Sequence, residues 1–390
     1  MFLKNVNKHY NLGKDTYTWE QRELNEVANR FNNLRVPITS NHRESGSTPY
    51  YGANGIQDYV KGYTHDGEFL LIAEDGANDL KDYPIHYVSG KIWVNNHAHV
   101  LQAIENYMNN YFLMYALKKL NIQPYLVGGG RSKLNSDVMM RLKLYLPNRE
   151  EQNKLSALLK NIDETITLLQ RKINNLNKVK KGLLQKLFPA KQSINPRIRF
   201  NGFNQDWEQR ELGDVAVVYD GTHQTPKYKD KGVMFLSVEN IKTLKSNKFI
   251  SNDDFEKGFK VYPQKDDVLM TRIGDIGTTN VVAINDKLAY YVSLALIKSK
   301  IMQPYFLSYL ISSNAVQNDI WRRTLHIAFP KKINKNEIVK ISISKPSLEE
   351  QLQIGELLKN IDETITLLQK ELEMNKQIKK GFLQKLFPKE

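Results

Sequence analysis

Two stretches of the chain repeat apolar residues with the alternating four- and three-residue spacing of a heptad. The apolar residues are Leu159, Ile162, Ile166, Leu169, Ile173 and Leu176 in the first stretch, and Leu358, Ile361, Ile365, Leu368 and Leu372 in the second. This spacing places them on one face of a helix and is typical of a coiled-coil seam. A proline lies shortly before and after each stripe, so the pattern predicts two helices of about 38 residues each.

Two polar signals bear on these helices. Ser347 followed by Glu350 has the spacing of a capping box at a helix start. Asn375 stands where the first stripe has Leu176. It is either a polar seam residue that fixes the register of the pair or part of a solvated helix end.

The two stretches are copies of one segment. LLKNIDETITLLQ occupies residues 158–170 and recurs unchanged at 357–369, while KKGLLQKLFP at 180–189 returns as KKGFLQKLFP at 379–388. WEQREL also begins twice, at Trp19 and at Trp207. These matches in the same order indicate a tandem duplication. The interiors between them share only echoes, such as GRSKLN at 130–135 beside PKKIN at 330–334.

The helices can bury their apolar seams in two ways. Each can pair with another molecule, or the two can pair with each other inside one chain. We favour the intramolecular pair, because both partners are then always present at high effective concentration. An antiparallel pair gives the chain a pseudo-two-fold relation between its halves.

Each interior alternates strand-like and helix-like patterns. β-Rich segments at 67–73, 91–96, 267–273 and 279–284 read as strands, and amphipathic segments at 106–120 and 303–321 read as helices. The predicted fold class is therefore α+β, with two globules joined by two long antiparallel helices. The predicted boundaries are 1–146 for the first globule, 147–189 for the first helix, 190–206 for a linker, 207–345 for the second globule and 346–390 for the second helix.

Charge and cysteine content narrow the function. The chain carries 56 Lys and Arg against 42 Asp and Glu, a formal net charge of +14, which makes a polyanion the first partner to consider. It has no cysteine, which excludes disulfides, thiolate metal sites and a cysteine nucleophile. No apolar run approaches the length of a membrane span and no signal peptide is visible, so we expect a cytoplasmic protein without membrane association.

Catalytic motifs are not found. VGGGRSK at 127–133 lacks the spacing of a phosphate-binding P-loop, and neither a G-x-S-x-G nor an HExxH motif occurs. His97 and His99 would share one face of a strand, but no third ligand is spaced to help them hold a metal. We expect a packed or surface pair, no bound metal, no cofactor and no catalytic residue in this chain.

Four basic or glycine-rich loops are candidate nucleic-acid-binding sites, and they are better supported than any catalytic site. Hydroxyl, lysine and backbone N–H groups suit phosphates, and arginine beside glycine can read guanine. An ordinary exposed loop is the alternative for each. The candidate DNA-binding residues are Ser47, Thr48, Tyr50, Tyr51, Asn54, Arg131 and Lys133 in the first interior, and Thr222, His223, Thr225, Lys227, Arg272, Asp275, Thr278, Lys331 and Lys332 in the second.

The order of these segments resembles the specificity (S, HsdS) subunit of type I restriction–modification systems. PRIRFNGFNQDWEQRELGDV at 196–215 is similar to the entry of the family's target-recognition domain. LPNREEQNKLSALLKNIDETI and KPSLEEQLQIGELLKNIDETI are similar to the entries of its conserved helices. The first half departs from the pattern, because it lacks the P-x-x-R-F-x-G-F lead-in of residues 196–203.

The resemblance implies a non-catalytic subunit. Each interior would read one half of an asymmetric, bipartite double-stranded DNA target, while the helix pair spaces the halves and docks two modification (M) subunits. The partners would carry S-adenosylmethionine and methylate adenine, and restriction (R) subunits using ATP and Mg²⁺ would join this core. The alternatives are a stand-alone DNA-binding protein and a coiled-coil scaffold for protein partners.

Overall fold

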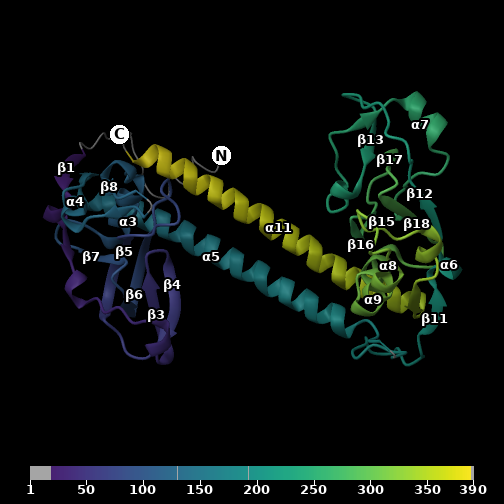
Figure 1. Cartoon of the computed structure of the whole chain (residues 1–390), viewed down its shortest axis with the longest axis horizontal. Coiled ribbons are helices and arrows are strands. Elements are labelled where there is room, and N and C mark those ends of the chain that lie inside the picture. Colours follow the sequence, from purple (N-terminus) through teal and green to yellow (C-terminus); the bar gives the residue numbers. More distant parts are fainter. Residues whose placement is uncertain (1–18, 130, 192, 388–390) are drawn as a thin grey trace. The chain divides into compact units, whose positions relative to one another are not determined.

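The computed structural model describes residues 19–129, 131–191 and 193–387. The chain divides into two compact units (Figure 1). Unit 1 comprises Met1–Leu169 with Glu371–Glu390, and unit 2 comprises Gln170–Lys370. Each unit therefore contains one α+β interior and a part of both long helices.

Both predicted long helices are present. α5 spans Arg149–Lys186 and α11 spans Leu348–Leu386, which are 38 and 39 residues. Asn148 caps the start of α5, because its side-chain oxygen accepts from the backbone N–H of Glu151 at 2.9 Å. Ser347 accepts from the N–H of Glu350 at 3.3 Å in the second. The reciprocal half of the predicted capping box does not form, because the Glu350 carboxylate bonds elsewhere.

The helix ends show that α5 and α11 run antiparallel. In unit 1, Leu159 and Ile162 near the start of α5 share a hydrophobic cluster with Phe382 near the end of α11. In unit 2, Leu183 near the end of α5 packs on the cluster that contains Leu358 near the start of α11. All the predicted seam residues are buried or half-buried. The seam is nonetheless broader than predicted, since its outer parts pack into the globular cores as well.

Asn375 does not act across the pair. Its side-chain amide donates to the backbone carbonyl of Glu371 at 2.9 Å, one turn earlier in the same helix. The structure therefore gives no support to a register-fixing contact at this residue.

Unit 1 is built on a six-stranded sheet in the order β2-β7-β5-β6-β3-β4 (Figure 1). The first four strands pair antiparallel, and β3 joins β6 in parallel. Helix α3 packs against β5, β6 and β7. The strands are β2 (Ala28–Arg30), β3 (Ser45–Gly52), β4 (Gly55–Val60), β5 (His65–Ala73), β6 (Ile85–Val94) and β7 (Ala98–Ala103), and α3 is Asn110–Lys119.

Unit 2 contains a four-stranded antiparallel sheet in the order β12-β18-β15-β16. A separate sheet has the order β14-β13-β17. The strands are β12 (Val217–Asp220), β13 (Val233–Leu236), β14 (Phe249–Ile250), β15 (Val268–Ile273), β16 (Asp275–Val281), β17 (Leu288–Tyr290) and β18 (Leu294–Lys298).

Each interior contains a four-stranded sheet of the same topology, here called the shared sheet, although the sequences of the two interiors show little similarity. β2-β7-β5-β6 and β12-β18-β15-β16 have the same order, the same chain direction and the same place along the duplicated segment. α3 packs on β6, as α8 (Pro304–Ile311) packs on β16. The duplication therefore extends through the interiors, and the added strands are what differ.

One predicted helix is two helices. The segment 303–321 forms α8 and then α9 (Asn314–Arg323). The break falls at Ser312 and Ser313, and serine favours helix ends because its hydroxyl competes for backbone hydrogen bonds. The prediction of one continuous helix was wrong.

Short elements frame each interior. β1 pairs with β10 in unit 1, and β11 pairs with β19 in unit 2, so each interior closes just before its long helix. These and the other short elements are β1 (Glu20–Glu23), α2 (Leu24–Val27), β8 (Leu126–Val127), β9 (Lys133–Leu134), α4 (Ser136–Met140), β10 (Lys143–Leu146), β11 (Glu208–Glu211), α6 (Leu212–Val215), α7 (Asn252–Gly258), α10 (Lys335–Ile338) and β19 (Ser342–Lys345), with 3-10 turns at Asn32–Leu34, Ser40–His42, Gln123–Tyr125 and Val238–Asn240.

Candidate nucleic-acid interface

The last loop of each interior returns to the same place on the shared sheet. In unit 1 the N–H of Leu134 donates to the carbonyl of Glu74, just beyond β5, at 2.7 Å. In unit 2 the N–H of Ile333 donates to the carbonyl of Arg272, near the end of β15, at 3.0 Å. The predicted loop 127–133 and the loop 325–332, which contains the predicted residues Lys331 and Lys332, therefore occupy equivalent positions, and this explains the echo between the sequences 130–135 and 330–334.

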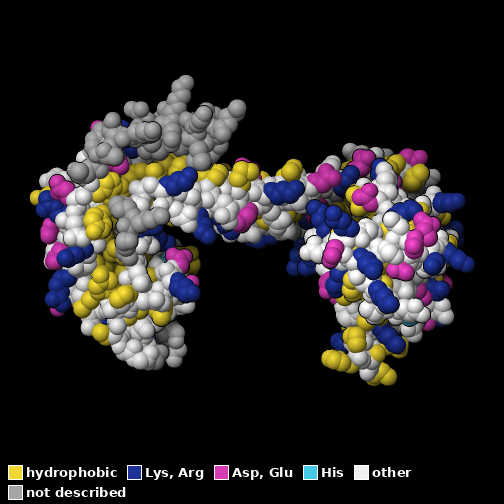
Figure 2. Space-filling model, turned by 90° about the horizontal axis from the view of Figure 1, so that it is seen from above, with side chains coloured by type: hydrophobic (Ala, Val, Ile, Leu, Met, Phe, Trp, Pro, Cys, Tyr) yellow, Lys and Arg dark blue, Asp and Glu magenta, His cyan; other side chains and the backbone are white. Residues whose placement is uncertain are grey.

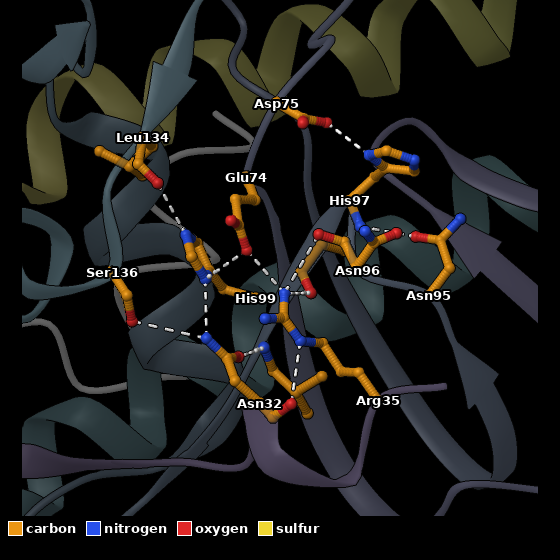
Figure 3. Close-up of polar contacts among 12 residues, drawn as sticks. Asn32, Arg35, Glu74, Asp75, Asn95, Asn96, His97, His99, Leu134 and Ser136 are labelled. Atoms are coloured by element: carbon orange, nitrogen blue, oxygen red, sulfur yellow. Dashed lines mark hydrogen bonds and ion pairs between the residues drawn. The ribbon is translucent and has the colours of Figure 1, made fainter. Parts of the chain in front are cut away.

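Glu74 is the centre of a charged cluster beneath the unit 1 loop (Figure 3). Its carboxylate accepts from Arg35 Nη1 at 2.7 Å and lies 3.0 Å from Lys133 Nζ. Burial alone would raise the pKa of this carboxyl, but the bonds from Arg35 and Lys133 outweigh it and lower the pKa below its usual value. Lys133 thus partly neutralises a half-buried acid and is itself exposed to solvent.

His99 is fixed as the neutral tautomer protonated on Nε2. Nε2 donates to the carbonyl of Leu134 at 2.8 Å. The Asn32 side-chain oxygen accepts from the N–H of Val100 at 2.8 Å, so its amide nitrogen faces His99 Nδ1 at 2.9 Å and donates to it (Figure 3). Burial lowers the pKa of His99, which agrees with this neutral state.

His97, the other histidine of the predicted pair, contacts a different carboxylate. His97 Nδ1 lies 2.6 Å from Asp75, which also accepts from Arg131 Nη2 at 2.9 Å. His97 and His99 therefore do not converge on one point. Across the described ranges, no group of three or more His, Asp or Glu side chains is arranged to hold a metal ion.

Three of the predicted unit 1 residues come together. Asn54, between β3 and β4, donates to the carbonyl of Gly76 at 2.9 Å. A side chain at Gly76 would lie 3.5 Å from the Arg131 guanidinium. Asn54, Arg131 and Lys133 therefore lie around one rim, formed by the turn after β3, the loop after β5 and the β8–β9 loop.

The other predicted residues of the first interior lie along β3. Ser47 is exposed and Thr48 is half-buried, at the far end of the strand from Asn54. Burial raises the pKa of Tyr51, which packs on the core. Tyr50 is 1% exposed and its hydroxyl bonds to the backbone of Ile38, so the prediction that Tyr50 contacts DNA is corrected to a core role.

Arg272 is buried at the equivalent place in unit 2. It is 6% exposed, its Nη1 is paired with Asp220, and its Nε donates to the carbonyl of Ile333 at 3.1 Å. Because all these contacts lie inside the unit, the guanidinium is not presented to a base edge. The prediction that Arg272 reads guanine is corrected: here it joins β12, β15 and the last loop.

The loop after β12 is exposed as predicted. His223, Thr225 and Lys227 face solvent, while Thr222 is half-buried and bridges to Tyr291. Gly221 is required at its base, because a Cβ there would lie 2.4 Å from a backbone carbonyl oxygen.

The turn between β15 and β16 lies beside the last loop of unit 2. The N–H of Gly274 donates to the carbonyl of Lys331 at 2.8 Å, next to an exposed Asp275. Thr278 is half-buried, and its N–H donates to the Thr271 hydroxyl at 3.0 Å. Lys331 and Lys332 are exposed and form no ion pair within the described part of the chain.

A repeated ion pair joins the long helices inside each unit. In unit 1, Asp163 of α5 lies 2.6 Å from Lys379 of α11 and accepts from the hydroxyls of Tyr111 and Tyr115 of α3. In unit 2, the equivalent contact joins Asp362 of α11 to Lys180 of α5 at 2.6 Å, and Tyr309 of α8 donates to Asp362. Each Asp thus meets the Lys of the other copy. The identical repeats contained this signal.

The sequence did not point to the half-buried polar residues under the loops. Asn32, Arg35, Glu74 and Asp220 have no motif of their own, and only their distant partners give them a role. Among the described residues, no helix is both long enough and apolar enough to span a membrane.

Comparison with known proteins gives a consistent result. The family model for the type I restriction modification DNA specificity domain matches twice, at residues 17–178 and 204–377. A putative type I restriction enzyme specificity subunit of Haemophilus influenzae is 36% identical over 266 residues, which cover 67% of each chain. The type I restriction enzyme MjaVIII specificity subunit of Methanocaldococcus jannaschii is 25% identical over 400 residues, 94% of this chain and 91% of that one. A crystal structure of the type I restriction–modification S subunit from M. genitalium has a similar fold, with a TM-score of 0.73, 14% identity, and coverage of 97% and 98%.

Proposed function

Because the chain belongs to the family of type I restriction–modification DNA specificity subunits, we propose that its two interiors each read one half of a bipartite DNA target. One observation carries this proposal. The two units place unlike loops at the same position on the same four-stranded sheet. A shared scaffold with different loops is suited to reading two different short sequences.

In unit 1 the proposed DNA-facing rim contains Asn54, Arg131 and Lys133, with Ser47 and Thr48 as further contacts along β3. In unit 2 it contains the loop after β12, the β15–β16 turn and the last loop, with His223, Thr225, Lys227, Asp275, Lys331 and Lys332 exposed. Lysine and hydroxyl groups of this kind bind phosphates and position the protein, while arginine and amide groups can read base edges. Thr222 and Thr278, which are half-buried, would support these loops.

The long helices are proposed to dock two modification subunits. Leu168 is 52% exposed and its repeat partner Leu367 is 64% exposed, although both lie on otherwise amphipathic helices. An apolar residue exposed twice at the same position in a duplication favours two equivalent docking sites. The modification subunits would bind S-adenosylmethionine and methylate adenine, and restriction subunits using ATP and Mg²⁺ would join them. This chain would hold none of these groups and would act in the cytoplasm, on the cell's own DNA.

Shortening both helices by one heptad tests the proposal. If helix length sets the gap between the half-targets, the shortened complex should select a different gap or fail to assemble. In a control variant, seven exposed residues of the helices are replaced by other helix-forming residues without a change in length. This variant should keep both the gap and the assembly. Unchanged spacing and unchanged assembly in the shortened variant would contradict the proposed role of the helices.

A further inference from the structure

The last loop of unit 2 ends in two fully exposed apolar side chains. Ile327 and Phe329 are 99% and 103% exposed, and Trp321 nearby is 65% exposed. Hydrophobic side chains gather at an edge of this unit with Lys and Arg side chains close to them (Figure 2). Large apolar side chains that protrude together from a loop usually mark a binding surface.

The loop is braced at its base, so its tip does not fold back onto the core. The N–H of Leu325 donates to the carbonyl of Lys332 at 2.8 Å, which closes the loop into a hairpin. Gly274 donates to the carbonyl of Lys331 at 2.8 Å and ties the hairpin to the β15–β16 turn. His326 Nε2 donates to the carbonyl of Trp321 at 2.8 Å, and the centroid of its imidazole ring lies 4.7 Å from that of the Trp321 indole.

Basic residues flank the tip in the sequence. Residues 320–336 contain no acid and five basic residues, which are Arg322, Arg323, Lys331, Lys332 and Lys335. Arg323 pairs with the flanking acids Asp319 and Glu337. Arg322, Lys331 and Lys332 are exposed and have no ion-pair partner among the described residues. An anionic partner therefore fits the loop's sides, and an apolar partner fits its tip.

We propose that Ile327 and Phe329 form a wedge that inserts between base pairs of the half-target bound by unit 2. This inference rests on the proposed function. Duplex DNA offers phosphates to the lysines and stacked, apolar base faces to the tip, and proteins kink DNA with apolar side chains of this kind. The equivalent loop of unit 1 contains Gly128, Gly129 and Arg131 at its turn instead. Unstacking is therefore confined to one half-target.

Fluorescence of 2-aminopurine tests the wedge. The complex of this chain with its modification subunits is bound to its target duplex, with 2-aminopurine placed in turn at steps of either half. We expect fluorescence to rise several-fold at one step of the half bound by unit 2, outside the methylated base, and to stay unchanged at the unmethylated steps of the other half. Phe329→Ser and Ile327→Ser should abolish this rise and weaken binding by about tenfold or more. Ile301→Ser, which alters another exposed isoleucine of unit 2, should change neither.

Three results would overturn the wedge and leave the proposed function intact. The first is specific binding by the unaltered complex with no fluorescence rise outside the methylated base. The second is loss of modification subunits from the Phe329→Ser complex on a sizing column, which would make the tip a protein-docking surface. The third is binding of the unaltered chain to anionic phosphatidylglycerol vesicles that Phe329→Ser abolishes while DNA binding stays unchanged. If the unaltered complex prefers no DNA sequence, the proposed function fails and the wedge fails with it.

Discussion

Replacing Arg199 with methionine is expected to destabilise unit 2 by about 3–5 kcal/mol, because the change leaves a buried carboxylate without its charged partner. The Arg199 guanidinium donates to both oxygens of Glu350, from Nε at 2.9 Å and from Nη2 at 2.8 Å. The indole N–H of Trp207 donates to the same carboxylate at 3.1 Å. Only 1% of the Glu350 side chain is exposed, so water cannot replace the lost partner.

A double-mutant cycle separates the ion pair from general packing. Glu350→Gln alone should cost about 2–3 kcal/mol, since it removes the charge that strengthens three hydrogen bonds. The combined Arg199→Met and Glu350→Gln variant should lose less than the sum, by about 2 kcal/mol or more. Glu151 of the first copy is the matched control. Burial raises its pKa despite Trp19 and Lys154 nearby, so Glu151→Gln should change stability by less than about 1 kcal/mol.

Urea unfolding, followed by fluorescence of the buried Trp207 indole, measures these differences. The unfolding transition of unit 2 is compared between variants at pH 7. A loss below about 1 kcal/mol for Arg199→Met, or full additivity in the cycle, would refute the interpretation that this pair anchors the segment before β11 to α11.

Four further substitutions should each act on one unit only. Lys379→Met should destabilise unit 1 by about 1–2 kcal/mol, and Lys180→Met should destabilise unit 2 by the same amount. Hydrogen exchange measured separately for each unit tests this. An equal effect of either substitution on both units would contradict the paired contacts. Burial lowers the pKa of His99, so its contribution to stability is present above pH about 6.5 and is lost as the pH falls from there through the folded-state pKa. His99→Gln should reduce the slope of the unfolding free energy against pH, between pH 5 and 6.5, by up to about 1.4 kcal/mol per pH unit. Urea titrations measure this slope, and an unchanged slope would contradict a buried, neutral His99. Gly221→Ala should destabilise unit 2 by about 2 kcal/mol or more, because its Cβ would lie 2.4 Å from a backbone carbonyl, whereas Gly129→Ala, with open space around it, should leave thermal unfolding unchanged.

The long helices could be predicted because their signal is local. The stripe from Leu159 to Leu176 repeats within one helix, and its copy from Leu358 to Leu372 makes the period unmistakable. The shared sheet gave no comparable signal. β2 has three residues and pairs Ala28 with Ala103, far along the chain. Such short strands acquire their place only through non-local pairing, which a single sequence does not encode in any periodicity.

The candidate site shows the same division between loops and side chains. Glycine and lysine marked segments that are exposed loops in the structure, because glycine favours turns and lysine favours solvent. The sequence did not predict that the Arg272 side chain points inward. It does so because β15 is buried on both faces, including at its charged residue. The prediction that Tyr50 contacts DNA was wrong for a related reason, because its hydroxyl hydrogen-bonds to the backbone of Ile38 inside the unit. The sequence alone does not indicate that Ile327 and Phe329 are exposed, because large apolar residues are more often buried.

Mapping N6-methyladenine across a genome tests the central claim most directly. The chain is co-expressed with its modification subunit in a host that lacks other adenine methylation, beside a variant with Lys331 and Lys332 changed to alanine. We predict a split motif of two unlike halves, methylated on both strands, and a loss of methylation in the variant without loss of the complex on a sizing column. Methylation that is absent or not bipartite, although the complex forms, would contradict the assignment of one half-target to each interior.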